Sequence, residues 1–264
     1  MPELAEVEFF RKQWNAGIGA KVLSVELHAR KRIFRDMNTR DLISSLTGAR
    51  YLRSSTHGKQ LLFEFSDGAR LGIHLGMSGA LRMETASSRS EKHDHLVLRQ
   101  QKCALVFRDP RLFGRVRFHR GEDDPSWLQQ SAPAINSTGF DRAFVDRFLK
   151  QHARAPIKAV LLMQRGFVGI GNWMADEILW RAGLAPALAA GKLTVAQRAR
   201  LFLATRFVAR ESLRIIGADD SDPPRSWLIH QRWKPGGICP RHRTPLRRET
   251  IGGRTTAWCT KCQA

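Results

Sequence analysis

The sequence predicts a two-lobed α+β protein: an antiparallel β-sandwich behind a terminal helix, then a helical domain ending in a metal-bound β-hairpin. Short apolar runs separated by turn signals occupy residues 20–120, which is typical of a sandwich or barrel. Beyond residue 139 the apolar residues follow a helical period. The tail carries two closely spaced pairs of metal-binding side chains.

The first residues predict an amphipathic helix that docks on a core. Its apolar side chains recur at helical spacing: Leu4, Val7 and Phe10 or Trp14. Pro2 at the first helical position loses no hydrogen bond, and Glu3 and Glu6 complement the positive end of the helix dipole.

The same residues suggest chemistry. If Met1 is removed, Pro2 becomes a free secondary amine followed directly by the carboxylate of Glu3. An α-amino group titrates near ~8, so part of it is a neutral nucleophile at physiological pH. Its attack on a sugar aldehyde carbon gives an iminium ion, which acidifies the neighbouring C–H and permits elimination. The alternative interpretation is an ordinary acidic helix start.

The strands of the predicted sandwich are seven apolar runs: Lys21–Leu27, Gln60–Phe65, Leu71–Leu75, Leu81–Met83, Leu96–Arg99, Ala104–Arg108 and Arg115–Phe118. Residues 84–94 are polar and predict an exposed loop. From residue 121 to 139 the composition shifts to proline, aspartate, serine and glutamine, which indicates an interdomain linker.

Four helices are expected after the linker: one around Phe144–Leu149, Ile157–Met163, Trp173–Ala182 and a long one that Thr194 and Gln197 open with a capping box. The glycine-rich stretch Arg165–Asn172 precedes the third of them, and Asn172 is expected to cap it. A helix N-terminus of this kind can bind phosphate, although a plain tight turn explains the stretch equally well.

Charge restricts the classes of partner. The 264 residues include 44 Lys and Arg against 24 Asp and Glu, which gives a net charge of +20 and a pI near 11.1. Such an excess favours nucleic acid as the partner, with an anionic membrane surface as the alternative. No segment approaches the length of a membrane span, and no signal-peptide pattern is present, so a cytoplasmic or nucleoid-associated, bacterial-type protein is expected. Cys103, alone in an apolar run, is expected to be a buried free thiol.

The C-terminal tail predicts one structural zinc ion. Cys239 and His242 form one ligand pair, and Cys259 and Cys262 form a second after sixteen intervening residues. The alternative is three free cysteines with an incidental histidine. Between the pairs, arginines including Arg254 suggest a basic hairpin that zinc keeps rigid and that is suited to a nucleic-acid groove.

Several separated motifs together resemble one family, the formamidopyrimidine-DNA glycosylases, within the wider group that includes endonuclease VIII. They occur in family order across nearly the whole chain: Pro2-Glu3-Leu4 with Glu6-Val7-Glu8, Gly58–Leu62, His74–Gly79, Lys92–His95, Asp109–Gly114, Gly169–Asn172 and the zinc hairpin with Arg254.

The resemblance implies a bilobal fold with double-stranded DNA in the cleft between the lobes. Its expected parts are a catalytic β-sandwich domain (1–125), a linker (126–138), a helix–two-turn–helix (H2TH) DNA-binding domain (139–234) and a zinc hairpin (235–264). It also implies a bifunctional enzyme of base excision repair, a glycosylase and abasic-site lyase acting as a monomer. The oxidised base is removed, and the strand is then cut by β,δ-elimination.

The matching positions carry expected roles. Pro2 is the nucleophile at C1′ of the sugar, Glu3 protonates the opening ring, and Lys59 contacts the phosphate beside the lesion. Met77, Arg111 and Phe113 resemble the trio that fills the gap left by a flipped nucleotide. Each residue has an alternative when it is considered alone: Met77 and Phe113 could equally be core side chains, and Lys59 could be a solvent-exposed charge on a strand. The remaining expected DNA contacts are Asn172, Arg254 and Lys158.

Departures from the family pattern concern the substrate. Ala5 stands where proline is usual, and His242 where a zinc cysteine is usual. The segment Ile216–Arg225 looks short and acidic where bacterial members carry a longer loop over 8-oxoguanine, and Gly171–Glu177 resembles plant members, which favour ring-opened or further-oxidised purines. An endonuclease VIII-like preference for oxidised pyrimidines and a non-catalytic lesion-binding homologue are the alternatives.

Overall fold

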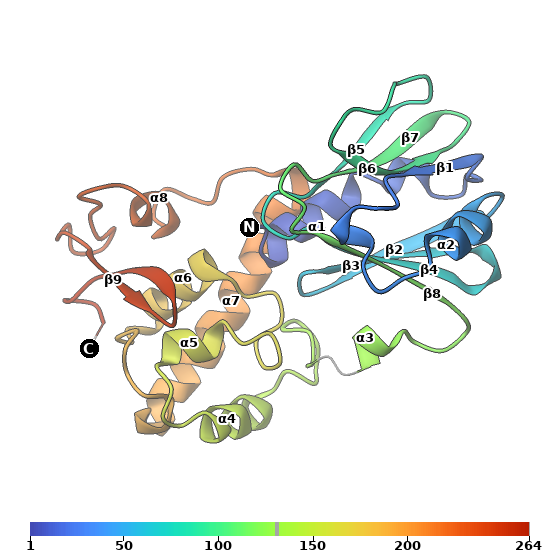
Figure 1. Ribbon diagram of the computed structural model, residues 1–264. Coiled ribbons are helices and arrows are strands. Elements are labelled where there is room, and N and C mark those ends of the chain that lie inside the picture. Colours follow the sequence, from blue (N-terminus) through green and yellow to red (C-terminus); the bar gives the residue numbers. More distant parts are fainter. Residues whose placement is uncertain (130–131, 264) are drawn as a thin grey trace. The chain divides into compact units, whose positions relative to one another are not determined.

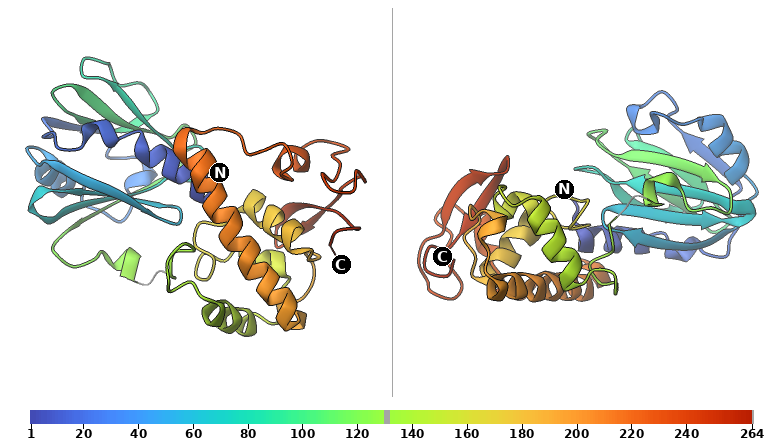
Figure 2. Two further views of the ribbon diagram at one scale, coloured as in Figure 1. Left: turned by 180° about the vertical axis from the view of Figure 1, so that it is seen from behind. Right: turned by 90° about the horizontal axis from the view of Figure 1, so that it is seen from below.

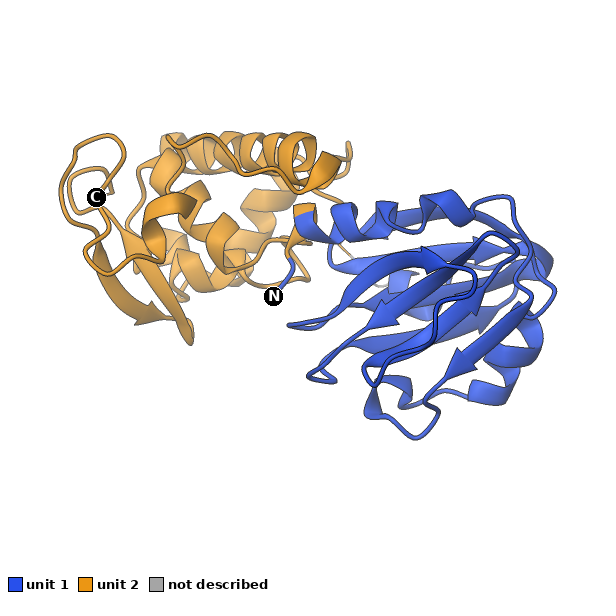
Figure 3. Cartoon of the chain, turned by 90° about the horizontal axis from the view of Figure 1, so that it is seen from above, with its two compact units in different colours: residues 1–2, 6–130 blue, residues 3–5, 131–264 orange. Residues whose placement is uncertain are grey.

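The computed structural model describes residues 1–129 and 132–263 (Figure 1). The chain forms two compact units, one of residues 1–2 and 6–130 and the other of residues 3–5 and 131–264 (Figure 3). Residues 3–5 thus belong with the C-terminal half of the chain, although they begin the N-terminal helix. The boundary at 130/131 lies within the segment expected to be a linker, and the four-part division of the chain stays a prediction.

The first unit is an antiparallel β-sandwich, as predicted. One sheet has the strand order β2-β3-β4-β8 and the other β1-β6-β7-β5 (Figures 1 and 2). The strands are β1 (Ser24–Leu27), β2 (Tyr51–His57), β3 (Gln60–Phe65), β4 (Ala69–His74), β5 (Ala80–Thr85), β6 (Asp94–Arg99), β7 (Cys103–Arg108) and β8 (Arg115–Arg120). The shorter elements of this unit are η1 (Asn15–Gly17), η2 (Arg32–Phe34), α2 (Thr39–Leu46), η3 (Ser66–Gly68) and α3 (Ser126–Gln129).

The N-terminal helix α1 (Leu4–Lys12) contributes to the core of each unit. Leu4 and Ala5 are buried in the core of the second unit, whereas Val7 is buried in that of the first. Trp14, just beyond the helix, is fully buried against Phe63 with ring centroids 4.6 Å apart. The expected docking helix is confirmed, but it begins at Leu4, so Pro2 precedes its first turn.

Strand β2 and helix α2 are the longest elements of the first unit that were not predicted. Strand β2 pairs only with β3 at the edge of its sheet, and most of its residues are polar and at least partly exposed, so it has no apolar run. Helix α2 is short and buries only Leu42 and Leu46, one turn apart. Its start is set by Asn38, whose side chain accepts a hydrogen bond from the Arg40 N–H.

The loop expected at residues 84–94 is shorter than predicted. Glu84 lies within β5, and Asp94 begins β6 and is buried. The Asp94 carboxylate lies 3.3 Å from the Arg82 guanidinium and 3.4 Å from that of Arg108. These two arginines keep the polar end of the strand inside the sheet. The expected buried free thiol of Cys103 is confirmed.

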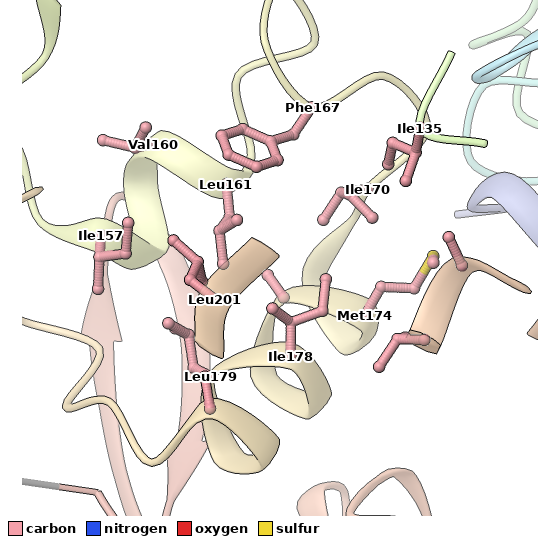
Figure 4. Close-up of a cluster of buried hydrophobic side chains, with 14 of the residues drawn as sticks. Ile135, Ile157, Val160, Leu161, Phe167, Ile170, Met174, Ile178, Leu179 and Leu201 are labelled. Atoms are coloured by element: carbon pink, nitrogen blue, oxygen red, sulfur yellow. The ribbon is translucent and has the colours of Figure 1, made fainter. Parts of the chain in front are cut away.

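The second unit is helical and ends in a two-stranded hairpin. Its elements are α4 (Arg142–Gln151), α5 (Ile157–Leu161), α6 (Asn172–Ala182), η4 (Ala190–Lys192), α7 (Val195–Asp219), α8 (Ile229–Arg232), β9 (Arg247–Ile251) and β10 (Arg254–Trp258). Helix α6 is buried along nearly its whole length, because α5, α7, α8 and β10 all pack around it (Figures 1 and 4). The predicted capping box of Thr194 and Gln197 is present at the start of α7.

Among the helices of the described residues, none is long and apolar enough to cross a membrane.

His74, at the end of β4, is a partly buried, neutral histidine. Its Nδ1 accepts a 3.0 Å hydrogen bond from the Gly76 N–H, which places the proton of the neutral ring on Nε2. Burial, with the charges of Lys59, Arg117 and Arg35 added, lowers the pKa of His74 from 6.5 to about 4. The unfolded chain therefore binds a proton at a higher pH than the folded one.

This difference predicts an acid-sensitive first unit. The stabilisation from neutral His74 is complete above pH 6.5 and is lost as the pH falls from there towards about 4, by about 3 kcal/mol at most. His74→Asn keeps an acceptor for the Gly76 N–H but does not titrate. Urea unfolding between pH 4.5 and 7.5 should show a clearly flatter pH dependence for the variant; parallel curves would contradict the assignment.

Candidate active site and metal centre

The carboxylate of Glu3 lies on the N-terminus of α6, inside the second unit. It is almost fully buried and accepts hydrogen bonds from three backbone N–H groups: Gly171 at 2.9 Å, Trp173 at 3.0 Å and Met174 at 3.1 Å. These are the N–H groups that a helix start leaves without intrahelical partners. The positive end of the α6 dipole favours the ionised carboxylate at this place.

The structure thereby corrects two expectations. Asn172 does not cap α6. The N-cap residue is Gly171, which has no side chain, and the Glu3 carboxylate accepts the hydrogen bonds that a capping side chain would accept. Nor does Glu3 serve the dipole of its own helix. A Cβ at Gly171 would lie 2.4 Å from Glu3 Oε1, so the close approach of the carboxylate requires glycine at this position.

The glycine-rich turn before α6 also holds the backbone of the N-terminal segment. The Leu4 N–H donates to the Gly169 carbonyl at 3.0 Å. Gln164 fixes the turn itself, since its side chain accepts from the Gly169 N–H at 3.0 Å and donates to the Ile170 carbonyl at 2.8 Å. In this structure the turn therefore receives the chain's own carboxylate, at a place where the sequence left a phosphate site and a plain tight turn as alternatives.

A buried carboxylate, Asp176, connects α6 to its surroundings. Arg232 donates to Asp176 Oδ2 from Nε at 2.9 Å and from Nη2 at 2.6 Å, and the Ala257 N–H of β10 reaches the same oxygen at 3.2 Å. Lys158 forms an ion pair with the other carboxylate oxygen. Asp176 thus attaches the hairpin to α6, a role that sequence analysis missed.

Lys158 is fully buried by these contacts. Besides its ion pair, its amine donates to the Asn172 carbonyl at 2.7 Å. Burial lowers the pKa of Lys158, and Asp176 opposes that shift. A direct contribution of Lys158 to DNA binding stays a prediction, and the contacts favour a supporting role for it at the start of α6.

Asn172 and Arg254 present polar groups at the hairpin side of α6. Asn172 Nδ2 donates to the Thr255 carbonyl at 2.9 Å, and among the described residues no hydrogen-bond partner reaches its buried Oδ1. Arg254 is exposed at the first position of β10, directly after the Gly252–Gly253 turn. Its guanidinium is thus presented near the tip of a basic hairpin.

The remaining expected catalytic residues, Pro2 and Lys59, belong to the first unit. Lys59 is buried and sits in the two-residue turn between β2 and β3, where His57 pairs with Gln60. Its charge is one of those that lower the pKa of His74. Pro2 is partly exposed.

The three residues expected to fill a gap in DNA are exposed on two loops of the first unit. Met77 follows β4 and is 43% exposed; Phe113 precedes β8 and is 41% exposed. The Arg111 guanidinium lies over the Phe113 ring, 4.9 Å from its centroid. Exposure excludes the alternative that Met77 and Phe113 are core side chains.

Asp109 connects these two loops by hydrogen bonds. It begins the motif Asp109–Gly114, but sequence analysis did not predict this role. It is fully buried and accepts from the Ser78 hydroxyl at 2.7 Å, the Gly114 N–H at 2.7 Å and the Arg111 N–H at 3.3 Å. The loops pack so closely that a Cβ on Gly76, which has φ +65°, would lie 2.4 Å from the Phe113 carbonyl carbon.

Four side chains at the end of the chain can hold a metal ion. The ligand atoms of Cys239, His242, Cys259 and Cys262 all lie within 4.8 Å of one another. Cys239 Sγ is 3.5 Å and His242 Nδ1 is 2.9 Å from Cys262 Sγ. The alternative that the histidine is incidental is thereby weakened, since it converges with all three thiols.

Two neighbours and the local backbone orient the thiols. Trp180 Nε1–H donates to Cys239 Sγ at 3.4 Å, and the Thr244 hydroxyl lies 3.4 Å from Cys259 Sγ. The Arg243 N–H donates to the Cys239 carbonyl at 2.9 Å, so this ligand pair sits on a tight turn. Hydrogen bonds of this kind hold metal ligands in place.

Comparisons with known proteins agree with this arrangement. Residues 1–116 match the formamidopyrimidine-DNA glycosylase N-terminal domain, and residues 132–221 match the H2TH domain of the same enzymes. The chain is 33% identical to formamidopyrimidine-DNA glycosylase of Bordetella avium and 34% identical to that of Thermus thermophilus. These alignments cover 100% of this chain and 99% and 98% of the relatives.

Solved structures show the same fold. A Lactococcus lactis Fpg (MutM) complex with DNA containing an oxidised pyrimidine has a TM-score of 0.89 at 28% identity, with 99% of each chain covered. A complex of the LlFpg protein with a THF-DNA and an inhibitor has the same TM-score over 100% of both chains.

One family domain matches each of the two units, which defines a protein that joins a β-sandwich to an H2TH domain. The chain belongs to the formamidopyrimidine-DNA glycosylase family, and the resemblance inferred from its motifs is confirmed.

The Asp109 contacts predict that Asp109→Asn loosens both exposed loops. An amide nitrogen cannot accept a hydrogen bond, so at least one of the Ser78, Arg111 and Gly114 donors loses its partner, at a cost of about 1–3 kcal/mol. Chemical unfolding and amide hydrogen exchange at Gly114 and Arg111 measure the effect, because the two amides bond to different oxygens of Asp109. Unchanged stability together with exchange at both amides as slow as in the parent protein would refute the tie.

Proposed function

We propose that this protein is a bifunctional DNA glycosylase and abasic-site lyase of base excision repair. It removes oxidised bases from double-stranded DNA and then cuts the strand at the abasic site, with Pro2 as nucleophile. The observation that carries the proposal is the buried Glu3 carboxylate on the N-terminus of α6. A chain terminus is normally mobile, whereas here the residue after Pro2 is fixed by three hydrogen bonds.

The fixed terminus suits nucleophilic chemistry. Once Met1 is removed, the secondary amine of Pro2 attacks C1′ of the damaged nucleotide, and the C–N bond to the base breaks. The ring-opened product is an iminium ion, positively charged without an added proton. Loss of a C2′ proton then expels the 3′-phosphate, a second elimination expels the 5′-phosphate, and water releases the amine.

Glu3 is suited to moving protons beside this amine. Three N–H donors hold its carboxylate in a fixed position, and a carboxylate can take up a proton and release it again. It takes the role of protonating the opening sugar ring and passing protons between the steps. Lys59 is proposed to contact the phosphate beside the lesion.

The DNA contacts follow from exposure and charge. Met77, Arg111 and Phe113 are proposed to fill the space of the flipped nucleotide, which offsets an unstacking cost of a few kcal/mol. Asn172 and Arg254 are proposed to hold the flanking phosphates. Lys158 and Asp176 support this grip by joining α6 to the hairpin.

The four-residue metal group is proposed to hold one structural zinc ion. A tetrahedral zinc with thiolate and imidazole ligands separates its ligand atoms by about 3.5–3.8 Å, and the ligand atoms here lie within 4.8 Å of one another. Three thiols and one imidazole bind zinc in preference to magnesium or calcium, which favour oxygen ligands. Bound zinc supplies rigidity to the hairpin that carries Arg254.

Ring-opened or hydantoin purines are the proposed preferred lesions, with 8-oxoguanine as a further substrate. The segment Ile216–Arg225, interpreted as short and acidic, begins inside α7, and only residues 220–228 connect that helix to α8. An endonuclease VIII-like preference for oxidised pyrimidines is the second candidate. The Lactococcus lactis neighbour has been crystallised with DNA that contains an oxidised pyrimidine and with DNA that contains Fapy-dG.

The protein is proposed to act as a monomer, cytoplasmic and associated with the nucleoid. Its net charge of +20 supports the association with DNA.

Blocking the Pro2 amine should prevent formation of the covalent intermediate with DNA. Protein with one extra residue before Pro2 has an amide in place of the amine, so borohydride should trap no adduct on abasic duplex DNA. The same protein should regain trapping after that residue is removed by a protease, and mass spectrometry should place the adduct on Pro2. A panel of duplexes with defined lesions ranks the substrates in the same assay.

Two results would oppose the proposal. Undiminished trapping by the extended protein would place the nucleophile elsewhere, and tight lesion binding without turnover by the mature protein would identify a non-catalytic homologue. Cleavage of thymine glycol well ahead of formamidopyrimidine and hydantoin lesions would establish the second candidate.

Removing the metal should lower the affinity for DNA, while the first unit should stay folded. One zinc per chain is expected by elemental analysis, and its chelation should free the hairpin and weaken duplex binding at least about tenfold. Cys262→Ser should do the same without a chelator, whereas Cys103→Ser, in the β-sandwich, is the matched control with unchanged affinity. Full affinity of the zinc-free protein would argue against the hairpin's role.

A further inference from the structure

An open groove runs along α7, beside the C-terminal end of α6. It has a volume of about 760 Å³. In the left view of Figure 2, the orange helix α7 faces the viewer along its length. The apolar floor of the groove includes Leu203 and Phe207, one turn apart, which are 56% and 37% exposed. These two side chains form a small apolar patch on the helix that a partner can cover.

The groove is strongly positive. Its described lining contains five arginines and no acidic side chain: Arg181, Arg200, Arg206, Arg210 and Arg241. Two of them have a carboxylate partner, since Arg181 pairs with Glu177 and Arg210 with Glu211.

The other three arginines are positioned by neutral acceptors. Arg200 donates to the Ala182 carbonyl at 3.0 Å, Arg206 to Ser137 at 3.2 Å and Arg241 to Trp180 at 3.4 Å. Carbonyl oxygens fix the direction of a guanidinium without cancelling its charge. The groove therefore has oriented positive charge around an apolar floor.

The groove lies away from the DNA-binding groups proposed above. Arg181 is nine residues after Asn172 on the straight run of α6, which corresponds to about 14 Å along the helix axis. The groove is thus at the opposite end of α6 from Glu3 and Asn172. None of the residues proposed to bind DNA lines it.

We propose that this groove binds an acidic peptide segment of a partner protein, with one or two large apolar side chains of that segment seated on Leu203 and Phe207. Aspartate or glutamate side chains of the segment pair with the surrounding arginines. Charge complementarity selects the acidic residues, and the apolar floor selects the side chains between them.

The floor favours a peptide over a nucleic acid. A nucleic-acid strand offers phosphates and flat bases, and a binding groove for it needs donors along its base and free aromatic faces for stacking. Here the Arg181 guanidinium lies over one face of the Phe207 ring, 4.6 Å from its centroid, and the Trp227 ring centroid lies 6.3 Å away, so less of the ring is available for base stacking. Leu203 offers only aliphatic surface.

The test is a fluorescence-anisotropy titration of the full-length protein with a labelled peptide of aspartates around one phenylalanine and one leucine. Two comparison peptides carry lysine for the aspartates or serine for the apolar residues. The acidic apolar peptide should bind at least about tenfold more tightly than either, a difference of about 1.4 kcal/mol. Equal affinity for all three peptides, or no binding of the first, would overturn the proposal.

The chain offers matched variants. Arg210 and Arg214 both lie on α7, both pair with Glu211 and are 69% and 66% exposed, but only Arg210 lines the groove. Arg210→Gln and Leu203→Ser should weaken peptide binding several-fold, whereas Arg214→Gln should not. Equal weakening by Arg210→Gln and Arg214→Gln would show general charge attraction and refute a built groove.

Two further readouts separate the groove from DNA. Base excision on a short lesion duplex should be unchanged in Arg210→Gln and Leu203→Ser, because neither residue belongs to the proposed DNA contacts. The peptide should also bind the protein when a lesion duplex is already bound. A single-stranded oligonucleotide should not compete for the groove. If it displaces the peptide and also binds the Leu203→Ser variant more weakly, the groove is a nucleic-acid site and the proposal is overturned.

Discussion

The contact between the Glu3 carboxylate and the first N–H groups of α6 is the constraint on which the second unit depends. It requires glycine at position 171, because any side chain there would collide with the carboxylate. It satisfies donors that a buried helix start would otherwise leave unpaired, and such donors are costly to bury. The helix so fixed also carries Asp176, which holds Arg232, Lys158 and the backbone of β10. One helix therefore places the proposed proton carrier, a proposed phosphate contact and the hairpin that follows the candidate metal group's first ligand pair.

In the first unit, too, a buried carboxylate accepts several hydrogen bonds, here from two loops. Asp109 accepts hydrogen bonds from both loops that carry the exposed trio, so Met77, Arg111 and Phe113 are presented on a rigid base although their side chains face solvent. A buried carboxylate with several donors is stable only when those donors stay in place. Exposed apolar residues on firmly held loops are suited to entering a base stack, because little conformational entropy is left to lose on binding.

The fold class followed from the sequence because both periodicities are strong and each covers a long stretch. The metal group followed from ligand spacing, and all four residues converge as predicted. The edge strand β2 and helix α2 were missed because an exposed edge and a helix with two buried leucines carry too few apolar residues to produce a pattern. The partner of Glu3 could not be foreseen, since hydrogen bonds across about 170 residues leave no local signal. Asp109 and Asp176 stood in recognised motifs, yet a motif does not reveal which donors its carboxylate collects.

Glu3 holds the N-terminal segment on α6 through these hydrogen bonds. Amide hydrogen exchange of the full-length protein tests it most directly, with Glu3→Ala compared with the parent protein. We expect the Gly171, Trp173 and Met174 amides to exchange much faster in the variant. The Phe144 amide, which Asp141 caps at the start of α4, is the internal control and should not change. Equal protection of the three amides in both proteins would contradict the claim.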